Sequence, residues 1–419
     1  MSKKTIVILI VIIAVLVLVL GIWLLFFTSP GIQTPVNNQT SNSPFGNYNG
    51  SSSTTPASTT ATTEAPANPN GTVQYINNGT SPLTKISTAP IAGAEVFDRK
   101  ITSTTTLSIV RYIERATGHT REYDRSTYTL STASNTTIPT IYQAWWSGNT
   151  VLAQFLDQDK TTIKTFTGSL PATTTPTTQL TGKFLTDNIY ALAISPKGNR
   201  VFTLPQGGSA IGSISNLDGT KKTSILNFPF NEWSVQWPNE NTVTLTTKPS
   251  SGTSGYMYFL STAGAMTKAL GNIAGLTTLT SPNFGYTIYS ASSAGGFSTG
   301  IYNFSKNNAF IFASNPTLPE KCVWSKLSKT TAYCAVPSTI PIGNYPDDWY
   351  QGNVSFVDNI YKVDLSLPAV SLIYKLPTNQ SIDAINLFLD QKEENLYFTN
   401  KSDYYLWGLA IKGLPTLGL

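Results

Sequence analysis

The stretch Ala193-Ile194-Ser195-Pro196-Lys197-Gly198-Asn199-Arg200-Val201 shows the unit from which most of the chain is built. An apolar run ends in a bulky residue, a turn rich in Pro, Gly and Asn follows, and a second apolar run begins. Short apolar runs bounded by such turns are typical of β-strands. In related units, the residue before the turn stands at Trp146, Ile194, Trp237, Thr280, Trp324 and near Phe388.

The units recur at a period of about 44 residues, which predicts an all-β fold, the β-propeller, with four strands per blade. A single blade can bury the two faces of its sheet only against neighbouring blades, so the blades close into a ring. With a further unit at 107–130, the length predicts seven blades of about 45 residues each, with six or eight as alternatives. The last unit, 382–411, is one strand short. A strand near 73–77 or 91–97 would complete it and close the ring.

The unit from Ala191 to Phe202 closely resembles the WD40-like repeats of TolB-type bacterial propellers. Their consensus has Ser-Pro-Asp-Gly-Lys before an apolar strand, and here Lys197 takes the place of the Asp. The other units have their turn at the same place in the repeat, but their residues differ from this consensus. The resemblance implies the fold, and it implies little about function because such propellers serve as scaffolds, ligand binders and accessory domains of enzymes.

Residues 6–27 are apolar except for Gly21, and Lys3 and Lys4 precede them. A helix of this length would span about 33 Å, against a bilayer of roughly 30 Å. We therefore predict a cytoplasmic tip and a single membrane anchor at 1–27, with the rest of the chain outside the cytoplasm. The alternative is a cleaved signal peptide, although such peptides have apolar cores of about 7–15 residues and a small-residue cleavage site.

Residues 28–85 form the predicted linker, which is rich in Ser, Thr, Pro and Asn and has the composition of a disordered spacer. The propeller domain is then expected at 86–419. Charged residues make up 12% of the chain, and the formal net charge is +5. No basic cluster with interleaved aromatic residues accompanies that charge, so nucleic acid is not an expected partner. The sequence leaves the oligomeric state open.

The chain has no catalytic signature. Its one histidine, His119, stands in a turn, and the chain contains two cysteines. These residues cannot form a zinc site of standard spacing, and Asp157-Gln158-Asp159 lacks the rest of a calcium loop. We therefore expect neither a metal nor a cofactor, and a protein that is not an enzyme. Trp145, Trp146, Trp237 and Trp324 could form a carbohydrate platform, but their places at strand ends favour packing between blades.

Four acidic residues shortly precede predicted innermost strands, namely Asp187, Glu232, Glu320 and Asp383. The loops that enter innermost strands surround the mouth of a propeller channel. The four carboxylates could therefore converge there on a cation, or they could be ordinary solvated acids of separate loops.

The longest break in the repeat, 337–353, is the first candidate for ligand binding. Its aromatic residues flank a pair of acids, in the set Tyr345, Asp347, Asp348, Trp349 and Tyr350. Aromatic side chains give a large contact area at a small entropy cost, and the acids could hold a cationic or hydroxylated ligand. The alternative is a loop that packs on itself and caps its blade.

Cys322 and Cys334 lie symmetrically about Ser328. If the hairpin turns at 327–329, the two cysteines face each other across antiparallel strands, within disulfide range. We predict a disulfide, with two buried free thiols as the alternative.

Together these features predict a non-catalytic binding or scaffold module for protein or glycan partners, anchored in the cell membrane and displayed in the cell envelope. One alternative is a glycan hydrolase or lyase with its site at the channel mouth, which convergent carboxylates would favour. A mouth lined by Ser, Thr and aromatic residues would favour binding. The other alternative is a structural subunit of an envelope assembly.

Overall fold

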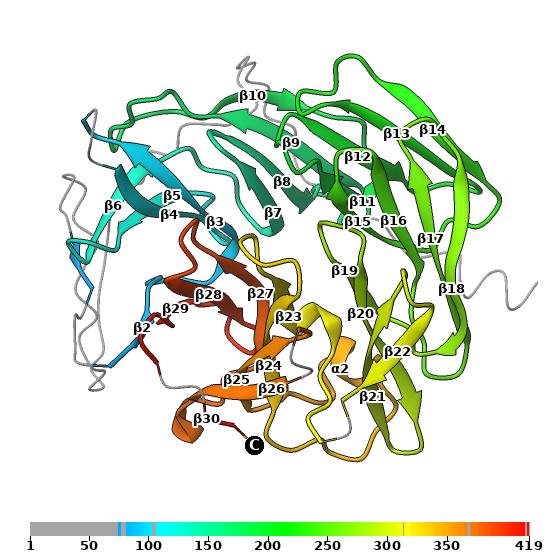
Figure 1. The fold of residues 1–419 in the computed structure, drawn as a ribbon. Helices are drawn as coiled ribbons and strands as arrows, with labels where there is room; N and C mark the ends of the chain where they lie inside the picture. The colour runs from blue at the N-terminus through cyan, green and yellow to red at the C-terminus, as the bar shows by residue number, and fades with distance from the viewer. Residues whose placement is uncertain are drawn as a thin grey trace, which may run out of the picture. The chain divides into compact units, whose positions relative to one another are not determined.

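The structure is a computed structural model that describes residues 74–76, 81–102, 106–312, 314–366, 369–414 and 417–418. The predicted anchor and most of the predicted linker lie outside these residues. No helix within them is long and apolar enough to cross a membrane. The described residues form seven antiparallel sheets arranged as the blades of a ring, which confirms the seven-bladed propeller and excludes six or eight blades (Figure 1).

Blades 1 to 6 each contain four strands that follow one another in the chain, from the innermost outward. Blade 1 contains β3 (Ile91–Lys100), β4 (Thr106–Glu114), β5 (Thr120–Asp124) and β6 (Thr129–Ser134). Blade 2 contains β7 (Ile141–Ser147), β8 (Thr150–Leu156), β9 (Ile163–Ser169) and β10 (Thr181–Phe184). Blade 3 contains β11 (Ile189–Ile194), β12 (Arg200–Pro205), β13 (Ala210–Asn216) and β14 (Thr223–Phe228). Blade 4 contains β15 (Trp233–Asn239), β16 (Thr242–Thr247), β17 (Ser254–Ser261) and β18 (Met266–Ala274).

Blade 5 contains β19 (Thr278–Thr280), β20 (Tyr286–Ser293), β21 (Gly296–Asn303) and β22 (Asn308–Ile311). Blade 6 contains β23 (Cys322–Trp324), β24 (Thr331–Pro337), β25 (Asp358–Asp364) and β26 (Ala369–Lys375). Blade 7 contains β27 (Ala384–Leu389), β28 (Asn395–Asn400) and β29 (Leu406–Ala410), and it takes its fourth strand from β2 (Leu83–Lys85). A short fifth strand extends blade 1, as β1 (Gln74–Tyr75), and blade 6, as β30 (Leu417–Gly418).

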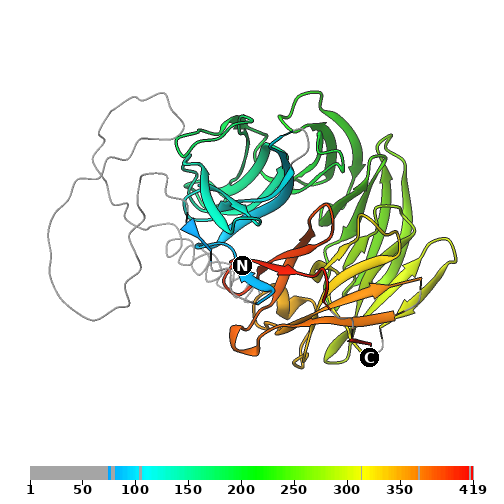
Figure 2. The same cartoon turned by 60° about the vertical axis from the view of Figure 1, so that its left-hand side comes forward.

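Blade 7 is closed by β2, which pairs antiparallel with β29 from Leu83 opposite Leu409 to Lys85 opposite Trp407. The blue strand therefore lies beside the red one in Figures 1 and 2. Neither segment predicted to complete the ring does so, because β1 joins blade 1 and Ile91–Lys100 is that blade's innermost strand. Since β1 and β2 are strands of the propeller, the domain begins before the predicted boundary at Ile86. The three residues of β2 cover the edge of β29, which would otherwise be unpaired, and Leu83 adds a buried side chain there.

The repeated residue before each turn lies at or near the end of an innermost strand. Ile194 and Trp324 are the last residues of β11 and β23, whereas Trp146 and Trp237 stand one and two residues before the ends of β7 and β15. The three tryptophans are buried, and the Trp324 indole stacks on Tyr286 of blade 5. They therefore pack between blades and form no exposed platform.

The chain enters every innermost strand at one end of the ring, called here the mouth face, and leaves it at the other, the base face. Neighbouring turns on the base face are tied together. Glu240 of blade 4 accepts a hydrogen bond from the Lys197 amide of blade 3 at 2.7 Å. Glu393 of blade 7 accepts one from the Lys326 amide of blade 6 at 2.6 Å. The turn at Lys197 needs Gly198, whose φ of +70° is disfavoured for other residues.

The disulfide is confirmed: Cys322 of β23 and Cys334 of β24 are direct cross-strand partners joined by an S–S bond, with their Cα atoms 4.1 Å apart. The turn between the strands, 325–330, contains the predicted position.

Candidate functional site

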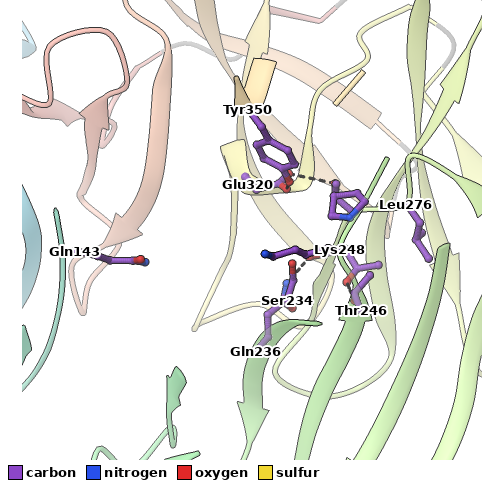
Figure 3. A pocket seen from close by; sticks show the side chains of 11 residues that line it. Gln143, Ser234, Gln236, Thr246, Lys248, Leu276, Glu320 and Tyr350 are labelled. Carbon is purple, nitrogen blue, oxygen red and sulfur yellow. Dashed lines mark hydrogen bonds between the residues drawn. The ribbon is translucent and has the colours of Figure 1, made fainter. Parts of the chain in front are cut away.

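A cavity of about 530 Å³ opens at the mouth face among the innermost strands. Blades 2, 4, 5 and 6 all contribute to its lining, which consists of Gln143, Ser234, Gln236, Thr246, Lys248, Pro249, Leu276, Thr277, Thr278, Glu320 and Tyr350. Glu320 belongs to the short helix η1 (Pro319–Lys321) before β23, and Tyr350 to the helix α2 (Asp347–Tyr350) between β24 and β25. Figure 3 shows Gln143 facing Glu320 and Lys248 from the opposite side of the cavity.

Glu320 is the carboxylate of this cavity, and two neighbours hydrogen-bond to it. The Tyr350 hydroxyl donates to its Oε1 atom, and the Thr277 hydroxyl donates to its Oε2 atom at 3.1 Å. Loss of solvent around the carboxyl raises the pKa of Glu320. Loss of solvent around the hydroxyl, together with the charge of Glu320, raises the pKa of Tyr350 well above its ordinary value. Tyr350 is therefore a permanent hydrogen-bond donor at neutral pH, and its side chain remains 44% exposed.

Several other side chains of the lining already form hydrogen bonds or ion pairs within the protein. Gln236 joins β15 to β19 by accepting from the Thr280 amide at 3.1 Å and donating to the Thr278 carbonyl oxygen. Lys248 pairs with Glu232 at 3.0 Å. In contrast, Gln143 and Ser234 are exposed to the cavity and have no side-chain hydrogen bond within the described ranges. These two side chains are therefore free to meet a ligand.

The four predicted mouth acids do not converge. Asp187 pairs with Lys164 at 2.8 Å on a separate loop, and Glu232 is occupied by Lys248. Asp383 is fully buried. Glu320 is the member of the set that lines the cavity, so the structure brings no pair of these carboxylates together there.

The loop between β24 and β25 turns most of its predicted binding residues inward. Tyr345 and Trp349 are 1% and 3% exposed, and both rings pack around Phe356. The Asp347 carboxylate accepts a hydrogen bond from the Ser251 amide, and the Asp348 carboxylate accepts one from the Asn344 amide of its own loop. This is the arrangement expected of a loop that caps its blade. Tyr350 is the residue of the set that reaches the cavity.

A buried ion cluster, which the sequence did not reveal, holds this loop in place. The Lys321 ammonium contacts Asp358 Oδ2 at 2.7 Å and Asp383 Oδ1, and all three side chains are 0% exposed. The other oxygen of Asp383 accepts from the Trp349 indole at 2.9 Å and from the Phe356 amide at 3.0 Å. Since Lys321 directly follows Glu320 and Trp349 directly precedes Tyr350, the cluster positions both polar groups of the cavity.

Asp358 gives the cluster a pH dependence. Burial raises its pKa to about 6, against the opposing charge of Lys321. Between about pH 4 and 6 the folded protein therefore holds a proton that the unfolded chain releases, and the contribution of Asp358 to the free energy of unfolding falls as the pH rises. We expect Asp358→Asn to flatten the dependence of stability on pH in this window, as measured by urea unfolding. Asp187→Asn is the control, because that carboxylate is largely exposed, and an unchanged slope in Asp358→Asn would refute the assignment.

His119 does not line this cavity. The His119 imidazole lies 4.0 Å from Glu114 in its turn, and burial lowers its pKa. Among the residues that the structure describes, no group of three or more His, Cys, Asp or Glu could hold a metal ion.

Neither a protein-family model nor a curated protein matches the chain. Solved structures with a similar fold include the tricorn protease, with 10% identity and a TM-score of 0.48 over 78% of this chain. This chain covers 34% of that protease. Virginiamycin B lyase from Staphylococcus aureus shares 12% identity and a TM-score of 0.48, over 81% of this chain and 99% of that one. TolB from Acinetobacter baumannii shares 11% identity and a TM-score of 0.40, over 78% and 66%.

The seven-bladed β-propeller is defined by the sheets of the described residues, and the tricorn protease, TolB and virginiamycin B lyase are similar to it in fold. At these identities the likeness concerns the fold alone.

Proposed function

We propose that this protein is a non-catalytic binding module of the cell envelope that holds a glycan at the mouth face. The observation that carries the proposal is the composition of the cavity: hydroxyl and amide groups, one carboxyl group and an exposed tyrosine ring surround about 530 Å³. Ligand sites commonly measure about 300–1,000 Å³. Gln143, Ser234 and Tyr350 offer donors, acceptors and a flat apolar surface, which is the combination that a sugar ring requires. The proposal includes anchorage by residues 6–27 with the propeller outside the cytoplasm.

The separation of the acids also favours binding over the alternative of a glycan hydrolase. Glycosidases of the common type use two carboxyl groups about 5–10 Å apart. Here Glu320 has no second carboxylate from the predicted set beside it, since Asp383 is buried against Lys321.

The test uses the full-length chain, purified in detergent, on an array of envelope polysaccharide fragments. We expect Gln143→Ala and Glu320→Gln each to lower the affinity for the captured glycan about two- to tenfold, because each removes about one hydrogen bond. Gln158→Ala is the matched control, because Gln158 is exposed on the mouth face but outside the cavity.

If both cavity variants bound the glycan as tightly as the native chain, the cavity would not be the binding site and the proposal would be wrong. Mass spectrometry of the released glycan separates the alternatives, because shortened or unsaturated products would indicate the enzyme.

A further inference from the structure

The two faces of the ring differ in charge. In the turns of the described residues, acidic side chains outnumber basic ones at the mouth face, whereas basic side chains outnumber acidic ones at the base face. Many lysines of the base-face turns are exposed and have no ion-pair partner in the described part of the chain, among them Lys100, Lys197, Lys221, Lys306, Lys326 and Lys329. No ion pair within the described residues neutralises these lysines, although the charge of Lys326 also acts on Glu95 and its amide binds the Glu393 carboxylate.

The turn after β23 combines this charge with an exposed apolar tip. Leu327 is 69% exposed, and Lys326 and Lys329 flank it. The turn is rigid, because the Ser325 hydroxyl oxygen accepts from the Leu327 amide at 3.1 Å and Glu393 accepts from the same amide at 3.1 Å. The disulfide lies at the start of the same hairpin. An apolar side chain held out between lysines is therefore a fixed feature of this face.

A cavity of about 330 Å³ adjoins the turn, between blades 5 and 6. Lys326 and Lys329 line it together with Ser328 and Asn283, while the Ser281 hydroxyl in the same lining already donates to the Tyr286 carbonyl oxygen at 2.9 Å. Ammonium, hydroxyl and amide donors are the groups that bind phosphate oxygens. A second exposed apolar tip, Ile101 beside Lys100, lies on the same face in blade 1 and is 53% exposed.

We propose that the base face docks on an anionic lipid bilayer, with Leu327 at the interface and Lys326 and Lys329 on lipid phosphate groups. Basic residues near apolar tips are the combination that binds such surfaces, through buried apolar area and attraction to anionic lipid together. Each lysine tightens surface binding about fivefold. The inference needs neither the anchor nor the glycan site. Docking in this way directs the acidic mouth face away from the membrane.

The experiment uses the full-length chain in two labelled forms. Leu327→Cys and Ile342→Cys each receive an environment-sensitive fluorophore, and the native cysteines are unreactive because they form the disulfide. Ile342 is the matched control, since it is 91% exposed on the mouth face. Each protein is added to vesicles of phosphatidylcholine, with or without phosphatidylglycerol, before the detergent is removed.

We expect the label at 327 to shift to the blue and to be quenched by nitroxide lipids in the phosphatidylglycerol vesicles, while the label at 342 does not. Adding Lys326→Gln and Lys329→Gln should weaken the docked state about thirtyfold. A label at 327 that stays as solvated as the one at 342 would overturn the proposal, as would an equal shift in pure phosphatidylcholine. Binding of soluble polyphosphate without any vesicle-dependent shift would assign the face to a soluble polyanion and would equally overturn it. Retention of the disulfide and of the urea midpoint shows that the variants fold.

Discussion

Replacing Lys321 with methionine is expected to lower the free energy of unfolding by about 3–5 kcal/mol. The Lys321 ammonium is fully buried and compensates the carboxylates of Asp358 and Asp383. Without it, two carboxylates stay in a site that water does not reach, and Asp358 Oδ1 already lacks a hydrogen-bond partner within the described residues. Removing one partner of a buried ion pair costs more than the pair contributes, because the remaining charge is uncompensated. Urea unfolding of the full-length chain in detergent measures the loss.

Two further variants show whether the effect comes from charge. Lys375→Met removes an exposed lysine from the same face and should change stability by no more than about 0.5 kcal/mol. The triple variant Lys321→Met, Asp358→Asn, Asp383→Asn removes the charges together and should recover most of the loss. If the triple variant were as unstable as Lys321→Met, the packing of the lysine stem and not charge compensation would explain the result.

Removing the disulfide is the second large effect. The double variant Cys322→Ala, Cys334→Ala is expected to lose about 3 kcal/mol, the chain-entropy value for a closed loop of this length, since the two residues are 12 apart. The cysteines are buried between blades 5 and 6, so alanine also leaves some unfilled volume there.

Reductant provides the control for this variant. Dithiothreitol should lower the urea midpoint of the native chain but leave the double variant unchanged. Equal midpoints for the native chain with and without reductant, with reduction verified by thiol labelling, would contradict a stabilising role for the bond.

The architecture follows from the sequence because each blade repeats one requirement. In most blades a bulky buried residue stands near the end of the innermost strand, as Trp237 and Trp324 do, and a tight turn follows it. The closing strand could not be found in this way. Leu83–Lys85 is too short to show a strand pattern, and its partner Leu409 stands at the other end of the chain.

The candidate site was only partly predictable, because side-chain direction depends on contacts distant in the sequence. Trp349 and Tyr350 are neighbours of the same type, yet the Trp349 indole turns inward to Asp383 while Tyr350 faces Glu320. The ion cluster was missed for a similar reason. Its three members come from η1, β25 and the segment before β27, and of these only Asp383 stood out in the sequence, as an acid shortly before an innermost strand.

The pairing of Leu83 with Leu409 also sets the order in which the protein can be completed during synthesis. Blades 2 to 6 build their four-stranded sheets from contiguous stretches of chain, so none of these sheets needs a strand from a distant part of the sequence. The first of the two partners is made before blades 1 to 6 and must wait, unpaired, until the segment around Leu409 has been translated. Closure of the ring through this pair therefore has to follow the synthesis of β29, and a chain truncated before Leu409 leaves β2 without its partner.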